Sequence, residues 1–354
     1  MNILWDFRLY SYGYGRRGVG VFTHRMAEAI LAEGINGRLF VWGEKNRVPL
    51  SFANQPVQWI DYVPRSWKSD LFTVPLLIRR NRIDIFHYWI GLGPLYSMGM
   101  GLFHGCKTCV TVHDLAVEYW NEIEHCRVVR TSMYWRFQKL IFSCADSVVC
   151  NSRATETELR QCFRRFLSPV SVLYVPLENT EARSSVAVKK QFIAFAGAAN
   201  KNVSGVLEAF SVFKKNNPDF ELCLVGEVET GKERALSTPG VMFEPASMLD
   251  RLLENSSGLI ACSIHEGLGL PVLSAMAHGC PLVVSDIPVF HETCGGAARF
   301  VDPLTPLSIV EGMEDIGRNR ETWAARSREG AARYRSLSKN TGAAWLRIYK
   351  ELLQ

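Results

Sequence analysis

Short apolar segments alternate with amphipathic segments from one end of the chain to the other. The apolar segments carry few charges, as is typical of parallel strands buried on both faces, and the amphipathic segments predict helices. In the first half the pattern predicts strands at residues 2–7, 37–42, 83–88, 108–113, 147–151 and 170–174, and helices at 21–33, 128–143 and 153–163. In the second half it predicts strands at residues 191–196, 221–225, 240–243, 258–262, 281–285 and 298–301, and a terminal helix at 340–353. This alternation predicts an α/β protein whose parallel sheets are covered by helices on both faces.

The domain organisation follows from a change of character at residues 177–190. This segment is polar, rich in Glu, Ser and Lys, and has no apolar periodicity, so we interpret it as a linker. A chain of 354 residues is long enough for two domains of ordinary size. We therefore predict a first domain at residues 1–176, a second at 191–335, and a terminal helix within 336–354.

The composition is that of a folded protein. Hydrophobic residues make up 47% of the chain and charged residues 21%, which is enough apolar material for packed cores. The first residues run into a strand-like segment without a basic leader, and ten cysteines are then expected as reduced, buried thiols, so we predict a cytoplasmic location. The longest uncharged stretch, residues 88–106, is interrupted by glycines, Pro94 and His104 and is a poor membrane span. Cys106 and Cys109 form a lone CxxC pair and the histidines lack ligand spacing, so we predict no metal site.

The net charge of +5 is unevenly distributed. Residues 1–180 contain 21 Lys and Arg against 15 Asp and Glu, a balance of +6, and the remainder contains 19 against 20, a balance of −1. A basic half suits nucleic acid or an anionic membrane, but no nucleic-acid-binding motif accompanies it, so we predict no nucleic-acid partner. Residues 65–82 and 128–142 mix aromatic and aliphatic side chains with basic ones. Two interpretations stay open for both: helices that lie on an anionic leaflet, or ordinary helices packed on the first sheet.

The most informative motif is EGLGLPVLSAMAHGCPLVVSD at residues 266–286. It follows an uncharged strand, and its glycines predict a turn before a helix that Pro271 begins. A helix N-terminus behind a glycine turn favours anions, because its N–H groups lack partners and its dipole is positive there. A phosphate would repel the carboxylate of Glu266. We therefore predict that Glu266 faces sugar hydroxyls.

This motif resembles the donor-binding signature of family 4 retaining glycosyltransferases of the GT-B fold, Glu-Gly-x-Gly-Leu-Pro followed by a second glutamate. Ser274 stands where the second glutamate would be, and the family holds the nucleotide ribose there. The resemblance implies two Rossmann-like, doubly wound domains that face a central cleft, with the terminal helix crossing back onto the first domain. It also implies a donor-binding segment made of Glu266, Gly267, Leu268, Gly269 and Leu270.

Three further segments carry the same resemblance. Gly18 and Gly20 precede the helix after the first strand, where the family has a Gly-x-Gly loop over the cleft. His113 ends a buried strand, where the family's histidine approaches the transferred sugar; a plain turn residue is the alternative. Gly197 and Lys201–Asn202 match the family's diphosphate-binding loop, although Ala198 replaces its arginine. A cation there would neutralise charge that develops on the departing diphosphate, whereas the alternative for Lys201 is a solvated surface lysine.

The resemblance therefore implies a retaining glycosyltransferase, independent of metal and without a cofactor, that uses a nucleotide sugar as donor. We assign the catalytic roles to His113, Glu266 and Lys201, with Asn202 beside the diphosphate. The expected reaction moves a hexose, with GDP-mannose as first choice, onto a glycan or lipid-linked acceptor of lipopolysaccharide or other surface polysaccharide, at the inner face of the cytoplasmic membrane. Two alternatives remain: a non-catalytic scaffold subunit of the same fold, favoured by Ala198 and Ser274, and a sugar-nucleotide 2-epimerase.

Overall fold

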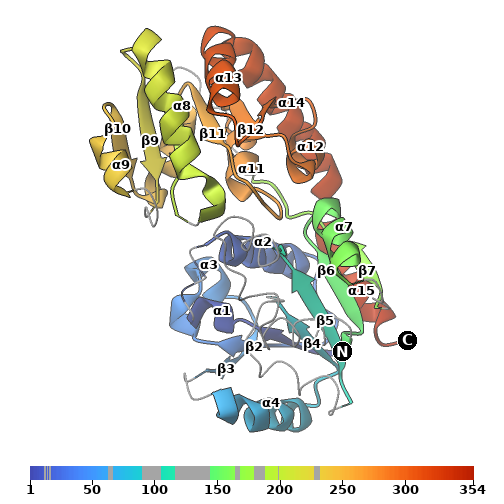
Figure 1. Ribbon diagram of the computed structural model, residues 1–354. Coiled ribbons are helices and arrows are strands. Elements are labelled where there is room, and N and C mark those ends of the chain that lie inside the picture. Colours follow the sequence, from blue (N-terminus) through green and yellow to red (C-terminus); the bar gives the residue numbers. More distant parts are fainter. Residues whose placement is uncertain are drawn as a thin grey trace. The chain divides into compact units, whose positions relative to one another are not determined.

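The chain divides into two compact units, Met1–Pro176 with Ser338–Gln354, and Leu177–Leu337. The first unit is thus assembled from two separate pieces of sequence, and both chain ends lie in it (Figure 1). The computed structural model describes residues 1–11, 13, 15, 17–62, 67–89, 105–115, 144–163, 168–178, 188–197, 199–226 and 232–354.

In its described residues the first unit contains a seven-stranded sheet in the order β3-β2-β1-β4-β5-β6-β7, and every neighbouring pair is parallel. Its strands are β1 (Asn2–Asp6), β2 (Arg38–Gly43), β3 (Gln58–Asp61), β4 (Ile85–Tyr88), β5 (Lys107–Val112), β6 (Ser147–Cys150) and β7 (Val170–Val172). Its helices are α1 (Arg8–Ser11), α2 (Gly18–Ala32), η2 (Lys45–Arg47), α3 (Leu50–Ala53), α4 (Trp67–Asn81), α7 (Arg153–Cys162) and α15 (Thr341–Glu351). Since this unit's strands are mostly buried, they form a continuous apolar core.

Most strands of this unit were predicted, and β3 was missed. β3 reads Gln-Trp-Ile-Asp and lies at the sheet edge, half-exposed and polar at both ends, so it lacks the apolar run that identifies the central strands. The helix predicted at residues 128–143 lies outside the described residues. Residues 65–82 contain α4, in which Pro75 is accommodated within the helix.

The terminal helix α15 packs on α2 in the first unit. Trp345 and Tyr349 are fully buried, and Gly342 approaches the helix so closely that a Cβ there would lie 2.1 Å from the carbonyl oxygen of Ala29. The Tyr349 hydroxyl accepts a hydrogen bond from Trp5 Nε1 (3.0 Å) and contacts His87 Nδ1 (2.6 Å). A helix that is last in the sequence therefore completes the core of the first unit.

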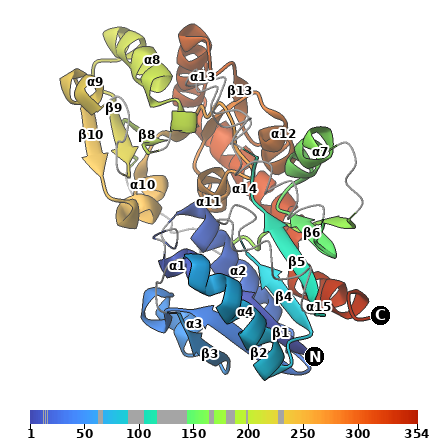
Figure 2. The ribbon, with the colours of Figure 1, turned by 60° about the horizontal axis from the view of Figure 1, so that its bottom comes forward.

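The second unit contains a six-stranded sheet in the order β10-β9-β8-β11-β12-β13, again entirely parallel. Its strands are β8 (Gln191–Phe195), β9 (Glu221–Val225), β10 (Val241–Glu244), β11 (Gly258–Ala261), β12 (Leu282–Ser285) and β13 (Arg299–Val301). Its helices are η4 (Ala199–Lys201), α8 (Val203–Asn216), α9 (Lys232–Ser237), η5 (Ala246–Met248), α10 (Leu249–Asn255), α11 (Leu270–Ala277), α12 (Pro288–Cys294), α13 (Pro306–Arg318) and α14 (Arg320–Ser338). α8 and α13 pack side by side (Figures 1 and 2).

Both sheets are doubly wound, which confirms the predicted fold class. In the first sheet the strand order reverses between β1 and β4, and in the second between β8 and β11. At such a reversal the two connections leave in opposite directions, which opens a crevice at the carboxyl ends of the strands. The loops after β8 and β11 are therefore where a ligand of the second unit is expected.

Candidate donor-binding site

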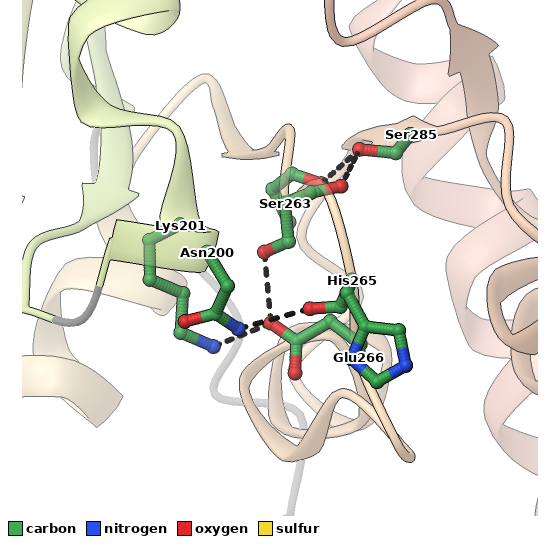
Figure 3. Close-up of polar contacts among 7 residues, drawn as sticks. Asn200, Lys201, Ser263, His265, Glu266 and Ser285 are labelled. Carbon is green, nitrogen blue, oxygen red and sulfur yellow. Dashed lines mark hydrogen bonds and ion pairs between the residues drawn. The ribbon is translucent and has the colours of Figure 1, made fainter. Parts of the chain in front are cut away.

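Two hydrogen bonds of Asn200 tie the loop after β11 to η4, which follows β8. The Asn200 carbonyl oxygen accepts from the backbone N–H of Ile264 (2.8 Å), and its side-chain Nδ2 donates to the carbonyl oxygen of His265 (2.9 Å). Segments 65 residues apart in sequence thereby become one rigid edge of the crevice. Figure 3 shows Asn200 and Lys201 extending from η4 toward the His265–Glu266 loop.

Glu266 and Lys201 form an ion pair at this edge. Oε1 of Glu266 accepts from Nζ of Lys201, and the same oxygen accepts from the hydroxyl of Ser263 (2.8 Å). The Glu266 side chain is 13% exposed and that of Lys201 is 22% exposed, so both charges lie in a partly desolvated setting where their attraction is stronger than in water. The Lys201 side chain is thus mostly buried and paired with a carboxylate within the protein, unlike a fully solvated surface lysine.

Ser263 is itself held from the neighbouring strand. The hydroxyl of Ser285, at the end of β12, donates to the carbonyl oxygen of Ser263 (2.6 Å), and Ser285 is fully buried. Ser263 is 3% exposed. The contacts therefore run from the interior of the sheet outward, from Ser285 through Ser263 to Glu266 (Figure 3).

A helix N-terminus completes the site. Gly269 is the N-cap of α11 with φ 82°, a left-handed conformation that favours glycine, and a Cβ there would lie 2.5 Å from the ring of Phe290. Pro271 occupies the first turn of the helix. A pocket opens between this turn and the ion pair, lined by Phe195, Lys201, Ile260, Ala261, Ser263, Glu266, Gly269, Pro271, Val272 and Phe290. A cation, a carboxylate and the positive end of a helix dipole thus surround one pocket.

The remaining predicted residues of the signature lie along the same turn and helix. Gly267 and Leu268 continue the loop from Glu266, and Leu268 is buried. Leu270 is the first residue of α11. Ser274 lies in the second turn, half-buried, and its carbonyl oxygen accepts from Nδ1 of His278 (2.9 Å).

Asn202 and Gly197 shape the loop after β8. Gly197 has φ 130°, and Asn202 is the N-cap of α8 with φ 53°. The Asn202 side chain caps the helix through Gly205 N–H (3.3 Å) and donates to the carbonyl oxygen of Pro303 (2.6 Å). Its amide is therefore engaged within the protein, where it holds the start of α8 against the segment after β13. Ala198 lies outside the described residues.

His113 lies in the first unit, directly after β5, and its ring is nearly buried. Nε2 donates to the carbonyl oxygen of Trp89 (2.6 Å), and the ring packs edge-on against Phe22 at 4.8 Å between centroids. Burial lowers the pKa of His113, so the ring is neutral near pH 7. Because a carbonyl only accepts, the proton is on Nε2 and the other ring nitrogen, Nδ1, is an acceptor.

The backbone of His113 is fixed from the next strand. Its carbonyl oxygen accepts from Nδ2 of Asn151 (2.7 Å), which follows β6. The Asn151 side-chain oxygen accepts from the hydroxyl of Thr155 (3.0 Å), and Ser152 caps α7 by accepting from Thr155 N–H (3.0 Å). Asn151, Ser152 and Thr155 are all buried. α7 thereby orients the amide that holds His113.

The glycine loop of the first unit is folded against itself. A Cβ on Gly20 would lie 2.4 Å from the carbonyl oxygen of Gly15, and the Tyr10 hydroxyl donates to the carbonyl oxygen of Gly20 (2.9 Å). Gly18 begins α2 two residues before this contact. The structure thus assigns Gly20 a close backbone approach within the loop.

Sequence reasoning missed the residues that brace the site. Ser263, Ser285 and Asn151 are small polar residues at strand ends, and Asn200 lies one residue before Lys201. Their position at the carboxyl ends of parallel strands was an available signal, because ligand crevices form there. Their partners lie far away in sequence, so the contacts themselves could not be derived.

Two family models match consecutive parts of the chain. The model described as Glycosyltransferase Family 4 matches residues 16–177, and the one described as Glycosyl transferases group 1 matches residues 178–333. Together with two doubly wound sheets and a pocket that joins a cation to a carboxylate, these matches define a GT-B glycosyltransferase. Within that class, the chain belongs to family 4.

The chain is similar to curated mannosyltransferases at low identity. It is 24% identical to the O-antigen chain mannosyltransferase RfbU of Salmonella typhimurium over 66% of this chain and 69% of that protein. It is 26% identical to the MMP alpha-(1->4)-mannosyltransferase of Mycolicibacterium hassiacum over 68% of this chain and 62% of that protein, which is less than two thirds of the relative's length. HepE of Anabaena in complex with UDP-glucose has a TM-score of 0.76 at 16% identity, covers 100% of this chain and 99% of that one, and shows the shared fold.

Neither a helix long and apolar enough to cross a membrane nor a group of three or more His, Cys, Asp or Glu side chains suited to hold a metal ion occurs among the described residues.

Proposed function

We propose that this glycosyltransferase moves a hexose, with mannose as first choice, from a nucleoside-diphosphate sugar to a glycan or lipid-linked saccharide, with retention at the anomeric carbon. The observation that carries the proposal is the Lys201–Glu266 pair beside the N-terminus of α11. A diphosphate matches the cation and the helix end, and a sugar matches the carboxylate. A nucleotide sugar joins both chemistries in one molecule.

Lys201 and α11 act on the leaving group. An ammonium group has three N–H donors, so Lys201 can keep its bond to Glu266 and still donate two to phosphate oxygens. As the bond between the anomeric carbon and the phosphate oxygen breaks, its electron pair moves to the diphosphate. The ammonium and the helix N-terminus stabilise this charge. The acceptor oxygen then bonds to the anomeric carbon from the same face, and its proton passes to the departing phosphate oxygen.

Glu266 and His113 position the sugar. Glu266 accepts hydrogen bonds from sugar hydroxyls, and the neutral ring of His113 has Nδ1 as an acceptor. Because protein groups neutralise the diphosphate, the mechanism requires no metal and no cofactor.

The relatives of this chain support a particular sugar and a particular kind of acceptor. Two mannosyltransferases support mannose, and RfbU, an O-antigen chain enzyme, supports lipopolysaccharide or another surface polysaccharide as the product. A lipid-linked acceptor would place the protein at the inner face of the cytoplasmic membrane. α4 suits such a contact, since Leu76 is 67% exposed and Arg79 and Arg80 are exposed beside it.

A second candidate, a non-catalytic scaffold subunit of the same fold, rests on Ser274. A serine is shorter than the glutamate of the family signature, carries no charge and has one oxygen where a carboxylate has two, so it cannot hold both ribose hydroxyls as a carboxylate can. Such a subunit would bind a nucleotide sugar without turnover. Nothing in the geometry favours the 2-epimerase.

Thermal stabilisation of the purified protein tests the donor site. GDP-, UDP-, ADP- and dTDP-sugars are added separately, with and without EDTA. We expect one nucleotide class to raise the melting temperature, EDTA to leave the shift unchanged, and Lys201→Met and Glu266→Gln to abolish it. Lys190→Met is the matched control, because Lys190 forms an exposed ion pair with Asp219 in the same unit. Binding without release of nucleoside diphosphate, in the presence of a panel of saccharide acceptors, would support the scaffold instead.

A further inference from the structure

The two carboxylate oxygens of Glu266 are not equivalent. Oε1 accepts from Lys201 Nζ and from the Ser263 hydroxyl (2.8 Å). Within the described part of the chain, Oε2 has neither a hydrogen-bond nor an ion-pair partner, and in Figure 3 no dashed line reaches it. One oxygen is thus committed to the protein and the other is available to a ligand in the pocket.

We propose that Ser263 is a positioning residue, which fixes the Glu266 carboxylate so that Oε2 accepts a hydrogen bond from a hydroxyl of the donor's sugar. The inference rests on the proposed function and adds a residue and an atom to it. Ser263 acts through Glu266, and Ser285 acts one step further back, because its hydroxyl holds the carbonyl oxygen of Ser263 (2.6 Å).

Lys201 by itself cannot hold the carboxylate in this orientation. An ammonium group is a compact charge on a flexible stem, and its three donors rotate freely, so it attracts a carboxylate without fixing the carboxylate's plane. The last torsion of a glutamate is also broad and has no sharp staggered minimum. A second donor at a different angle removes this freedom, and Ser263 supplies it.

Ser263 gains importance when the donor binds. In the proposed mechanism Lys201 turns its remaining donors to the diphosphate, which weakens its control of Glu266. The Ser263 hydroxyl keeps its bond to Oε1, because the Ser263 carbonyl oxygen is held by Ser285 at the end of β12 and the residue is only 3% exposed. The sugar therefore meets an acceptor whose position depends on two buried serines.

The test compares a nucleotide sugar with the same nucleotide lacking the sugar. Dissociation constants are measured by calorimetry for GDP-mannose against GDP and for UDP-glucose against UDP. The variants are Ser263→Ala, Ser263→Cys and Ser263→Thr. Cysteine keeps the volume but is a weak donor, and threonine keeps the hydroxyl. Ser257→Ala is the control, since it removes another buried hydroxyl, which donates to the carbonyl oxygen of Lys189 (2.9 Å) in the same unit.

For whichever pair the wild type binds, we expect Ser263→Ala and Ser263→Cys to weaken the nucleotide sugar by roughly tenfold or more, the effect of one hydrogen bond to a charged group. The affinity for the bare nucleotide should change by less than about twofold. Ser263→Thr should keep the affinity for the nucleotide sugar close to that of the wild type. Ser285→Ala should weaken that affinity in part, and Ser257→Ala should leave it unchanged.

Equal losses for the sugar nucleotide and the bare nucleotide would overturn the inference, as would no loss in either. Both results leave the proposed donor site standing, because the wild type would still bind. If only an ADP-sugar or a dTDP-sugar binds, the same comparison is made between that sugar nucleotide and its bare nucleotide. If the wild type binds none of the four classes of nucleotide sugar, the proposed function fails, and this inference fails with it.

Discussion

The hydroxyl of Tyr349 offers a direct measure of how firmly the terminal helix is attached. It accepts from Trp5 Nε1 (3.0 Å), and its own proton is then available to Nδ1 of His87 (2.6 Å). Nε2 of His87 completes the chain by donating to the Thr111 hydroxyl (2.8 Å). All four residues in this series of hydrogen bonds are fully buried, so no water can replace a lost partner.

Tyr349→Phe deletes this oxygen and leaves Trp5 and His87 each with an unsatisfied polar atom. An unsatisfied buried group costs about 1–3 kcal/mol, so we expect the free energy of unfolding of the first unit to fall by about 2–4 kcal/mol. The ring remains, and the cavity is no larger than one oxygen atom. The loss therefore reports hydrogen bonding and not packing.

Urea denaturation measures this loss. The transition of the first unit is followed by tryptophan fluorescence, since Trp5, Trp89 and Trp345 lie within contact distance of one another or of His87. Thr111→Val removes the hydroxyl at the other end of this hydrogen-bond series with little change in side-chain shape. A double-mutant cycle with Tyr349→Phe should show coupling between the two substitutions. A change below about 0.5 kcal/mol in Tyr349→Phe, or strict additivity in the cycle, would refute the chain of hydrogen bonds.

Three further predictions follow from single features of the structure. Burial lowers the pKa of His87 well below its usual value, so below about pH 6.5 the unfolded state binds more protons than the folded state. The unfolding free energy of the first unit should therefore fall as the pH is lowered from 6.5, and a constant value between pH 5 and 7 would contradict this. Gly269→Ala places a Cβ 2.5 Å from Phe290 at φ 82° and should cost about 1–3 kcal/mol and weaken nucleotide binding, as seen by thermal melting and calorimetry; unchanged values of both would argue against the turn. Asn151→Leu frees the His113 carbonyl oxygen (2.7 Å) and should lower the rate of sugar transfer while nucleotide affinity stays the same, whereas an unchanged rate would remove Asn151 from the site.

The elements of the fold were largely predictable from the order of residues. Strands such as β8 and β12 are short apolar runs bounded by polar residues or turns, and their burial on both faces is what such runs indicate. β3 was missed because an edge strand is half-exposed and has no such run. Burial against neighbouring strands, which the sequence does not contain, decides this case.

The candidate site was predictable in its chemistry and not in its contacts. Glu266 could be identified from the motif around it, and Lys201 from its place ahead of a helix. Their ion pair could not, because the two residues are 65 positions apart and meet only when β8 and β11 become neighbours. The two serines are ordinary in the sequence, and their role depends on strand ends that the sheet brings side by side.

The sequence by itself determined the alternation of strands and helices, the glycine turns and the charged residues at the strand ends, since these follow from local periodicity and local backbone preference. The tertiary structure alone decided that α15 completes the first unit, that His113 is held by Asn151, and that Oε1 of Glu266 is occupied while Oε2 is available. These are contacts between segments distant along the chain. Burial and hydrogen-bond satisfaction select them only once the whole sheet has formed.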